Sequence, residues 1–273
     1  MSDTEAHVAG HYGINNLFDL IVDGLVKSGV DADRIEAAHL KPVDEFHIGG
    51  LAATKAFMDP LAIGPETQVL DIGSGLGGSA RFIAGEYGAP VTGIDLTPEF
   101  VETARKLSDL VGLETTFVTG SALDLPFDDA SFDLATLFHV GMNLPDKPRL
   151  FEQAARVLRD GGRFAVYDVM QFGAHPAFPL PWSGTPEGSF LATPEDYLQA
   201  ANNAGFQLID RNDRGDVARA FFAEMQARMA AGDGPAVGLP LLMGEDAPIK
   251  AANMRAAVDA GDIQPVEMIF KKG

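Results

Sequence analysis

Short, nearly continuous apolar runs alternate with longer stretches of helical periodicity over much of this chain. Such runs are typical of β-strands that are buried on both faces, as in parallel sheets. Each of the first five runs is followed by a helix-like stretch, and this alternation predicts a doubly wound α/β fold with a mostly parallel sheet of seven strands. The expected strands are Gln68–Ile72, Val91–Ile94, Thr115–Val118, Leu134–Phe138, Arg163–Val169, Phe206–Asp210 and Val266–Phe270.

The N-terminal part of the chain has a different pattern. Four apolar residues recur there at the spacing of one helix face, namely Leu17, Leu20, Ile21 and Leu25. A second helical segment runs roughly from Gly50 to Leu61. We therefore expect residues 1–60 to form a helical cap on a main domain that spans residues 61–273.

Two stretches of the main domain do not follow the alternation. Residues 172–189 are rich in proline and glycine, and we expect them to form a long loop over the carboxyl edge of the sheet. Residues 214–262 have a mostly helical pattern and form an insertion before the last strand. Both insertions are expected to lie over the active site.

Capping residues predict where several helices begin and end. Thr97-Pro98 and Thr193-Pro194 each place an N-cap residue before a proline at the first helical position. A further helix is expected from Asp146 to Arg159, where the glycines at 161 and 162 follow.

Composition narrows the function classes. The net charge is −19 and Lys and Arg do not cluster, which disfavours nucleic acid as a partner. No apolar run approaches the roughly 20 residues that span a bilayer, so no membrane partner is expected. The lack of cysteine excludes disulfides and thiolate ligands and fits a cytoplasmic location. The six histidines are not spaced as metal ligands, so no metal site is expected. The sequence leaves open whether the protein forms a homodimer.

The most informative motif is the glycine-rich turn after the first expected strand. Gly73, Gly75 and Gly78 fit the Gly-x-Gly-x-x-Gly pattern, which lets a nucleotide approach the backbone closely. Asp71 stands before this turn, and a fixed carboxylate there disfavours the pyrophosphate of NAD. A cofactor that carries an ammonium and a sulfonium group tolerates the carboxylate. The turn therefore favours S-adenosylmethionine over NAD.

Polar residues also follow the next two expected strands, where ligands bind in open α/β sheets. Asp95 ends the second strand, 17 residues after Gly78, and is placed to accept hydrogen bonds from both ribose hydroxyls. Ser121 and Ala122 follow the third strand and suit an adenine edge, with Leu96 as an apolar wall. An ordinary turn is an equally good interpretation of Ser121 and Ala122.

His139 ends the fourth expected strand, where the reacting centre of such a sheet is expected. Its imidazole would take a proton from the molecule that accepts the methyl group, or would position that molecule. A structural role of His139 fits the sequence equally well. Asp168, at the end of the fifth strand, could take a proton, bind a cation or cap the loop. Phe138 is expected beside the cofactor, and the residues expected around the substrate are Tyr12, His47, Met142, Asn143 and Trp182.

Five segments in this order resemble motifs of class I S-adenosylmethionine-dependent methyltransferases, over about residues 67–170. They are Val69–Gly78, Gly-Ile-Asp-Leu at 93–96, Gly-Ser-Ala-Leu-Asp-Leu-Pro-Phe at 120–127, Ala-Ser-Phe-Asp at 130–133 and Ala-Arg-Val-Leu-Arg-Asp-Gly-Gly at 155–162. The segments at 46–50, 139–143 and 179–182 resemble the small-molecule branch, which includes sarcosine and dimethylglycine N-methyltransferases and sugar or natural-product O-methyltransferases. The resemblance implies a Rossmann-like fold, S-adenosylmethionine as cofactor and S-adenosylhomocysteine as product.

The resemblance also implies roles for single residues. Asp71 and the turn Gly73-Ser74-Gly75 would hold the methionine portion of the cofactor, and Asp95 would hold the ribose. Ser121 and Ala122 would hold the adenine. This family usually has Asp where the chain has Ser121, so the adenine contact would lack a charge.

Together, these observations predict methyl transfer to a small-molecule acceptor, with the amine nitrogen of a glycine-betaine-type metabolite as the preferred interpretation. O-methylation of a natural product or sugar is the first alternative. An NAD(P)-dependent reductase is more remote, because short-chain reductases usually have lysine four residues after a tyrosine, and no tyrosine of this chain does. A binding protein that senses the cofactor is the remaining alternative.

Overall fold

The seven expected strands form one sheet in the computed structural model, which describes residues 3–12, 16–45, 47–232 and 243–273. The strands follow the order β3-β2-β1-β4-β5-β7-β6, and all neighbours are parallel except β7, which is antiparallel to β5 and β6. This order confirms the doubly wound, mostly parallel sheet. The bounds are β1 (Val69–Ile72), β2 (Val91–Asp95), β3 (Thr116–Thr119), β4 (Phe132–Phe138), β5 (Leu158–Gln171), β6 (Phe206–Asp213) and β7 (Ile263–Lys272).

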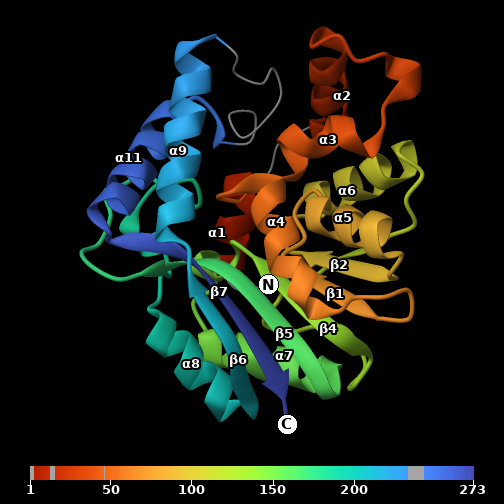
Figure 1. Cartoon of the computed structure of the whole chain (residues 1–273), viewed down its shortest axis with the longest axis vertical. Coiled ribbons are helices and arrows are strands. Elements are labelled where there is room, and N and C mark those ends of the chain that lie inside the picture. The colour runs from red at the N-terminus through yellow and green to blue at the C-terminus, as the bar shows by residue number, and fades with distance from the viewer. Residues whose placement is uncertain (1–2, 13–15, 46, 233–242) are drawn as a thin grey trace.

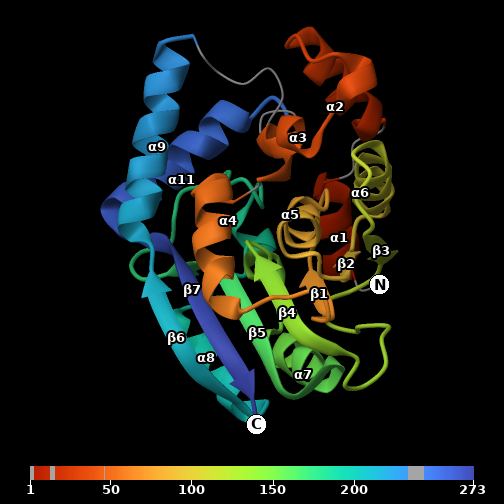
Figure 2. The same ribbon diagram turned by 45° about the vertical axis from the view of Figure 1, so that its right-hand side comes forward.

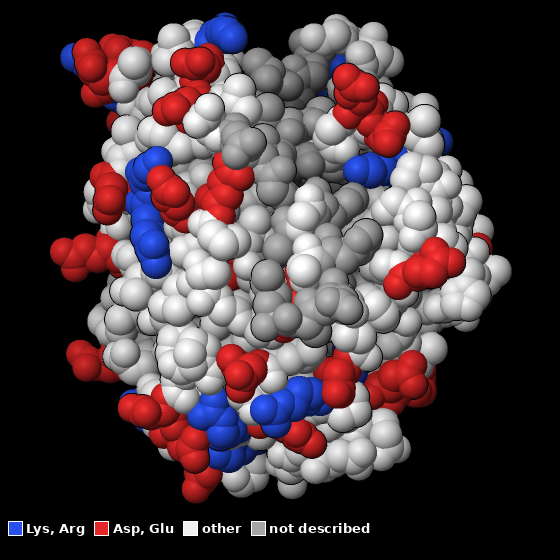
Figure 3. Space-filling view, turned by 180° about the vertical axis from the view of Figure 1, so that it is seen from behind, with Lys and Arg blue, Asp and Glu red and all other residues white. Residues whose placement is uncertain are grey.

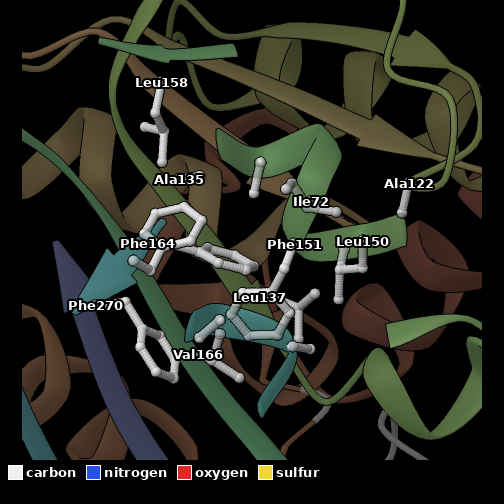
Figure 4. Close-up of a cluster of buried hydrophobic side chains, with 14 of the residues drawn as sticks. Ile72, Ala122, Ala135, Leu137, Leu150, Phe151, Leu158, Phe164, Val166 and Phe270 are labelled. Atoms are coloured by element: carbon white, nitrogen blue, oxygen red, sulfur yellow. The ribbon is translucent and has the colours of Figure 1, made fainter. Parts of the chain in front are cut away.

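Helices cover both faces of this sheet (Figure 1). On one face α7 (Lys147–Val157) and α8 (Pro194–Asn203) bury their apolar residues against the strands. This is the core drawn in Figure 4, where Phe151 of α7 lies among Phe164 of β5 and Phe270 of β7. On the other face α4 (Gly50–Met58), α5 (Gly78–Tyr87) and α6 (Pro98–Leu110) form a second core with β1 and β2. Burial on both faces explains the near-continuous apolar strands.

Helix α7 ends earlier than the sequence pattern predicts. It begins after Asp146, whose side chain accepts a hydrogen bond from Arg149 N–H, but it ends at Val157. Leu158 is extended and fully buried, and it pairs with Phe132 as the first residue of β5. Burial of Leu158 in the sheet thus ends the helix before the glycines do, and the expected end at Arg159 was wrong. The capping box at Thr193 confirms the expected start of α8.

The N-terminal segment is helical, as expected, in α1 (Asp3–Tyr12), α2 (Leu17–Lys27) and α3 (Ala37–Asp44). Leu17 and Ile21 of α2 are buried in a cluster with Leu107 of α6, whereas Leu20 is 42% exposed. An ion pair between Asp44 and Arg81 links α3 to α5. Helices α2 and α3 stand above one end of the sheet, next to α5 and α6 (Figures 1 and 2), whereas α1 contacts the Pro186–Gly188 turn. The domain boundary at residue 60 stays a prediction.

In the described residues of the insertion before the last strand, helices α9 (Gly215–Ala230) and α11 (Ala247–Ala260) lie side by side (Figures 1 and 2). The 172–189 loop packs against them, because Trp182 shares a buried cluster with Phe222 and Met254. Both insertions therefore lie over the carboxyl ends of the central strands. Short 3-10 helices occur at Ala32–Arg34, Asp59–Leu61, Gly141–Asn143 and Pro186–Gly188. None of the helices described here is long and apolar enough to cross a bilayer.

Candidate functional site

A cavity of about 730 Å³ lies at the carboxyl ends of β1, β2 and β4, where ligands bind in doubly wound sheets. Its walls come from two sides of the molecule. The glycine turn, the end of β2 and the turn after β3 form one side. Residues of α9, α11 and the 172–189 loop form the other side, and His139 lies at the end of β4.

The glycine turn is fixed to the neighbouring strand by backbone hydrogen bonds. The N–H groups of Gly73 and Ser74 both donate to the Ile94 carbonyl, at 2.8 and 3.0 Å. Gly73 has φ +71°, and a Cβ there would lie 2.3 Å from Cγ2 of Val140, so only glycine fits. Gly75 has φ +52° and faces open space. Gly73 and Gly75 line the cavity and Ser74 does not, because its side chain is buried in the turn.

Asp95 is an oriented hydrogen-bond acceptor in the cavity wall. Its Oδ2 accepts from Gly75 N–H and its Oδ1 accepts from Thr97 N–H, each at 2.9 Å. Burial raises the pKa of this carboxyl, while these N–H groups lower it. A carboxylate oxygen has a second lone pair, so each oxygen can accept a further hydrogen bond from a ligand. Two adjacent hydroxyl groups match this acceptor.

The turn after β3 completes this side of the cavity. Ser121, Ala122 and Leu96 all line it, as expected. The Ser121 Oγ accepts a hydrogen bond from Leu123 N–H at 3.1 Å, which leaves its own O–H to donate. A polar edge beside apolar walls suits a flat heteroaromatic ring.

Asp71 does not line the cavity, which corrects the expectation that it faces a cationic cofactor. It is 1% exposed, and its Oδ1 and Oδ2 accept hydrogen bonds from Thr136 at 2.7 Å and from Ser79 at 2.5 Å. Burial raises its pKa to about 6, against the lowering effect of these two hydroxyls. Asp71 therefore joins β1 to β4 and α5 beneath the glycine turn, and its effect on a ligand is indirect.

His139 faces the cavity in a strained backbone conformation, with φ +52°. Its Nε2 is buried and has no hydrogen-bond partner among the described residues. Burial and the nearby His47 keep its pKa well below the usual 6.5, so the imidazole is neutral and can accept a hydrogen bond. A buried acceptor without a partner costs free energy, and it marks the place where a ligand donor would bind.

His47 lines the cavity next to His139, with 5.8 Å between the ring centroids. Its Nε2 lies 2.9 Å from Thr54 Oγ1 and 3.3 Å from Glu45 Oε2. Burial lowers the pKa of His47 to about 4 and raises that of Glu45 to about 7. The imidazole is therefore neutral near pH 7 and is held by its neighbours. Phe46 lies outside the described residues.

Asp168 is not at the cavity, which corrects its expected catalytic role. Its Oδ2 accepts a hydrogen bond from the Tyr197 hydroxyl at 2.6 Å, and its Oδ1 accepts from Val169 N–H at 2.9 Å. The residue is fully buried, and burial raises its pKa to about 6. β5 continues to Gln171, so Asp168 lies inside the strand and joins it to α8. It is a structural residue.

Four of the expected side chains, Phe138, Met142, Asn143 and Trp182, line the cavity. Tyr12 ends α1, and its side chain lies outside the described part of the structure. An apolar wall from the second insertion was not predicted from the sequence. It consists of Phe221, Phe222, Met225, Met229, Met243 and Met254. The spacing of Phe221, Met225 and Met229 at i, i+4 and i+8 was an available signal. No cluster of three possible metal ligands occurs within residues 3–12, 16–45, 47–232 and 243–273.

Residues 70–166 match the methyltransferase domain family, and this range holds the glycine turn, Asp95, Ser121 and His139. The match covers the central strands and the turns that line the cavity, from β1 to β5. The chain is also 34% identical to a sarcosine/dimethylglycine N-methyltransferase of Halorhodospira halochloris over 154 residues, which cover 55% of this chain and 55% of that relative. The chain thus spans about half the length of this relative.

Solved structures share the fold of this chain over most of its length. The cyclase SpnF is 23% identical with a TM-score of 0.68, and the likeness covers 92% of both chains. A phosphoethanolamine N-methyltransferase 2 of Haemonchus contortus, solved in complex with S-adenosyl-L-methionine, is 19% identical with a TM-score of 0.70. That likeness covers 84% of this chain and 54% of the Haemonchus chain. At these identities the likeness concerns the fold.

Proposed function

We propose that this chain transfers a methyl group from S-adenosylmethionine to a small-molecule acceptor. One observation carries the proposal: a single cavity joins the glycine turn and Asp95 to a neutral histidine whose buried Nε2 has no partner among the described residues. The methyltransferase domain at residues 70–166 and the solved relative that holds S-adenosyl-L-methionine support the choice of cofactor.

The residues on the cofactor side fit this molecule. Asp95 would accept hydrogen bonds from the two ribose hydroxyls, and the backbone of Gly73 and Gly75 would lie against the methionine portion. The Ser121 hydroxyl and Ala122 would contact the adenine. S-adenosylmethionine supplies a methyl group on a positively charged sulfur, and its by-product is S-adenosylhomocysteine. Asp71 would affect cofactor binding by holding the glycine turn in place, without contacting the cofactor.

The acceptor side has to align the acceptor and exclude water. His139 Nε2 would accept a hydrogen bond from the O–H or N–H of the acceptor. As the lone pair of the acceptor forms its bond to the methyl carbon, the carbon–sulfur bond breaks and its electron pair stays on sulfur. The proton that the acceptor loses passes to His139 or, through it, to solvent. A neutral imidazole is required for this role, and burial keeps it neutral.

The sequence predicts an amine of the glycine-betaine type as acceptor, and one relative is named as a sarcosine/dimethylglycine N-methyltransferase. The acceptor class of this chain is open between such an amine and a less polar molecule. O-methylation remains the alternative. We also propose that the acceptor is a free metabolite rather than nucleic acid, since the net charge is −19. A cytoplasmic location, a homodimer and a division into residues 1–60 and 61–273 belong to the same proposal.

The test is formation of S-adenosylhomocysteine from S-adenosylmethionine over a panel of acceptors. The panel contains sarcosine, dimethylglycine, phosphoethanolamine, a simple phenol and a hydroquinone. We expect acceptor-dependent product formation with at least one class. Binding of S-adenosylmethionine without turnover across the panel would favour the cofactor sensor instead.

A further inference from the structure

We propose that the acceptor is an uncharged, largely apolar molecule, bound between α9, α11 and the 172–189 loop, and not a small amino acid. This inference rests on the proposed function, because it concerns the second half of the same cavity. It selects between acceptor classes that the methyltransferase fold leaves open.

The two halves of the cavity lie over different strands. Asp95, Ser121 and the glycine turn follow β2, β3 and β1, at one end of the strand order. Helices α9 and α11 pack against β7, which lies beyond β4 and β5 in that order (Figure 1). His139 directly follows β4, between the two halves. A molecule that reaches His139 from the α9 side therefore contacts the wall of α9 and α11.

That wall is apolar and rich in methionine. Five of the nine methionines of the chain line this one cavity, namely Met142, Met225, Met229, Met243 and Met254. Phe221, Phe222 and Trp182 lie among them. Methionine side chains are flexible and polarisable, so such a wall adapts to an irregular apolar ligand.

Core packing alone does not explain these side chains. Phe222 and Met254 are buried in the cluster beneath the wall, but Met229 is 64% exposed. Met225 is only partly buried and lines the cavity. An apolar wall that remains open to a cavity is the usual lining of a site for an apolar ligand.

The charges in this half do not suit an amino acid. Sarcosine and dimethylglycine carry a carboxylate, and moving a carboxylate out of water without a cationic partner is strongly unfavourable. Among the described lining residues, the one guanidinium or ammonium group is that of Arg255. Arg255 already donates to Gln226 Oε1 at 2.7 Å and pairs with Asp259 at 3.3 Å.

The test uses the uncharged fluorescent probe N-phenyl-1-naphthylamine and the intact chain saturated with S-adenosylhomocysteine. We expect the probe to bind together with S-adenosylhomocysteine, and excess dimethylglycine to leave it bound. Met225→Gln should weaken probe binding about tenfold, because it replaces an apolar contact by a polar one. Ile249→Gln is the matched control, since Ile249 is a 54% exposed residue of α11 outside the cavity.

Three results would overturn the inference: no probe binding, displacement of the probe by dimethylglycine, or equal probe affinity in Met225→Gln and wild type. Displacement of the probe by S-adenosylhomocysteine would also do so, because it would place the probe in the cofactor half. Failure of S-adenosylhomocysteine to bind, measured separately by calorimetry, would instead contradict the proposed function. Thermal unfolding of each variant shows whether it is folded.

Discussion

At the scale of single residues, His139 has the clearest chemical role to test. Its φ of +52° is tolerated better by Asn than by Ala, so His139→Asn removes the imidazole with less backbone strain. We expect kcat to fall about a hundredfold or more, the usual effect of losing a general base, with little change in cofactor affinity. Turnover and calorimetric titration of the same samples measure the two effects.

His175→Asn is the control, because His175 is exposed and does not line the cavity. It should leave both quantities unchanged. Unaltered kcat in His139→Asn would remove this histidine from the mechanism.

Gly73 tests the turn at the same scale. A Cβ at this position meets Val140 and the backbone has φ +71°, so Gly73→Ala should both destabilise the protein and weaken cofactor binding. The matched variant is Gly85→Ala in α5, where a Cβ has no neighbour closer than 3.7 Å. It should raise the free energy of unfolding by about 0.5–1 kcal/mol. Denaturant unfolding compares the two, and equal effects would show that the turn does not require glycine.

At the scale of elements, Asp168 joins β5 to α8 and makes that joint sensitive to pH. Its folded-state pKa is raised from 3.8 to about 6 by burial. Between pH 3.8 and about pH 6 the Asp168 carboxyl is ionised in the unfolded chain but protonated in the folded chain. The free energy of unfolding therefore falls as the pH rises through this range, and it levels off above about pH 6. Asp168→Asn does not titrate. From pH 4 to pH 7 the wild type should lose about 2–3 kcal/mol relative to this variant.

Tyr197→Phe is the companion variant for the joint. The Tyr197 hydroxyl lowers the pKa of Asp168, so its removal should extend the loss of stability to higher pH. Urea unfolding over this pH range measures both variants. Parallel curves for wild type and Asp168→Asn would contradict the assignment of this carboxyl.

The strands also show which parts of the fold and of the site could be predicted from the sequence. Buried strands were predictable because both of their faces need apolar residues. The positions of Asp95 and His139 in the cavity wall were predictable because each stands at the carboxyl end of such a strand. The direction of a side chain was not predictable. Asp71 pairs in register with Thr136 and points to that hydroxyl across the sheet. Asp168 lies inside β5 because the strand continues past its expected end.

The apolar wall depends on contacts that no local pattern reveals. Met225 and Met254 are far apart in sequence, and they share one cavity only because α9 packs against α11. The sequence predicts that residues 214–262 are mostly helical, but it does not show which helices pack together. The residues that determine which acceptor binds could therefore not be predicted from the sequence.

At the scale of the whole molecule, the net charge of −19 acts on stability. Asp and Glu are spread over the face seen in Figure 3, with fewer Lys and Arg among them. Such a surface repels itself, and salt screens this repulsion. We expect the midpoint of thermal unfolding to rise as NaCl increases from low concentration to about 0.15 M. A midpoint that falls would show that attractive ion pairs outweigh the repulsion.

The central claim is that the cavity over β1 and β2 binds a methyl donor through Asp95. Calorimetric titration with S-adenosylhomocysteine tests it directly, with Asp95→Asn, the exposed-site control Asp128→Asn, and NADPH as the competing ligand. We expect one molecule to bind per chain and Asp95→Asn to bind about 10- to 100-fold more weakly, since the amide lacks the negative charge and keeps only one of the two acceptor oxygens. Asp128→Asn should bind like wild type and NADPH should give no heat. Binding of NADPH in place of S-adenosylhomocysteine, or equal affinity in Asp95→Asn, would contradict the claim.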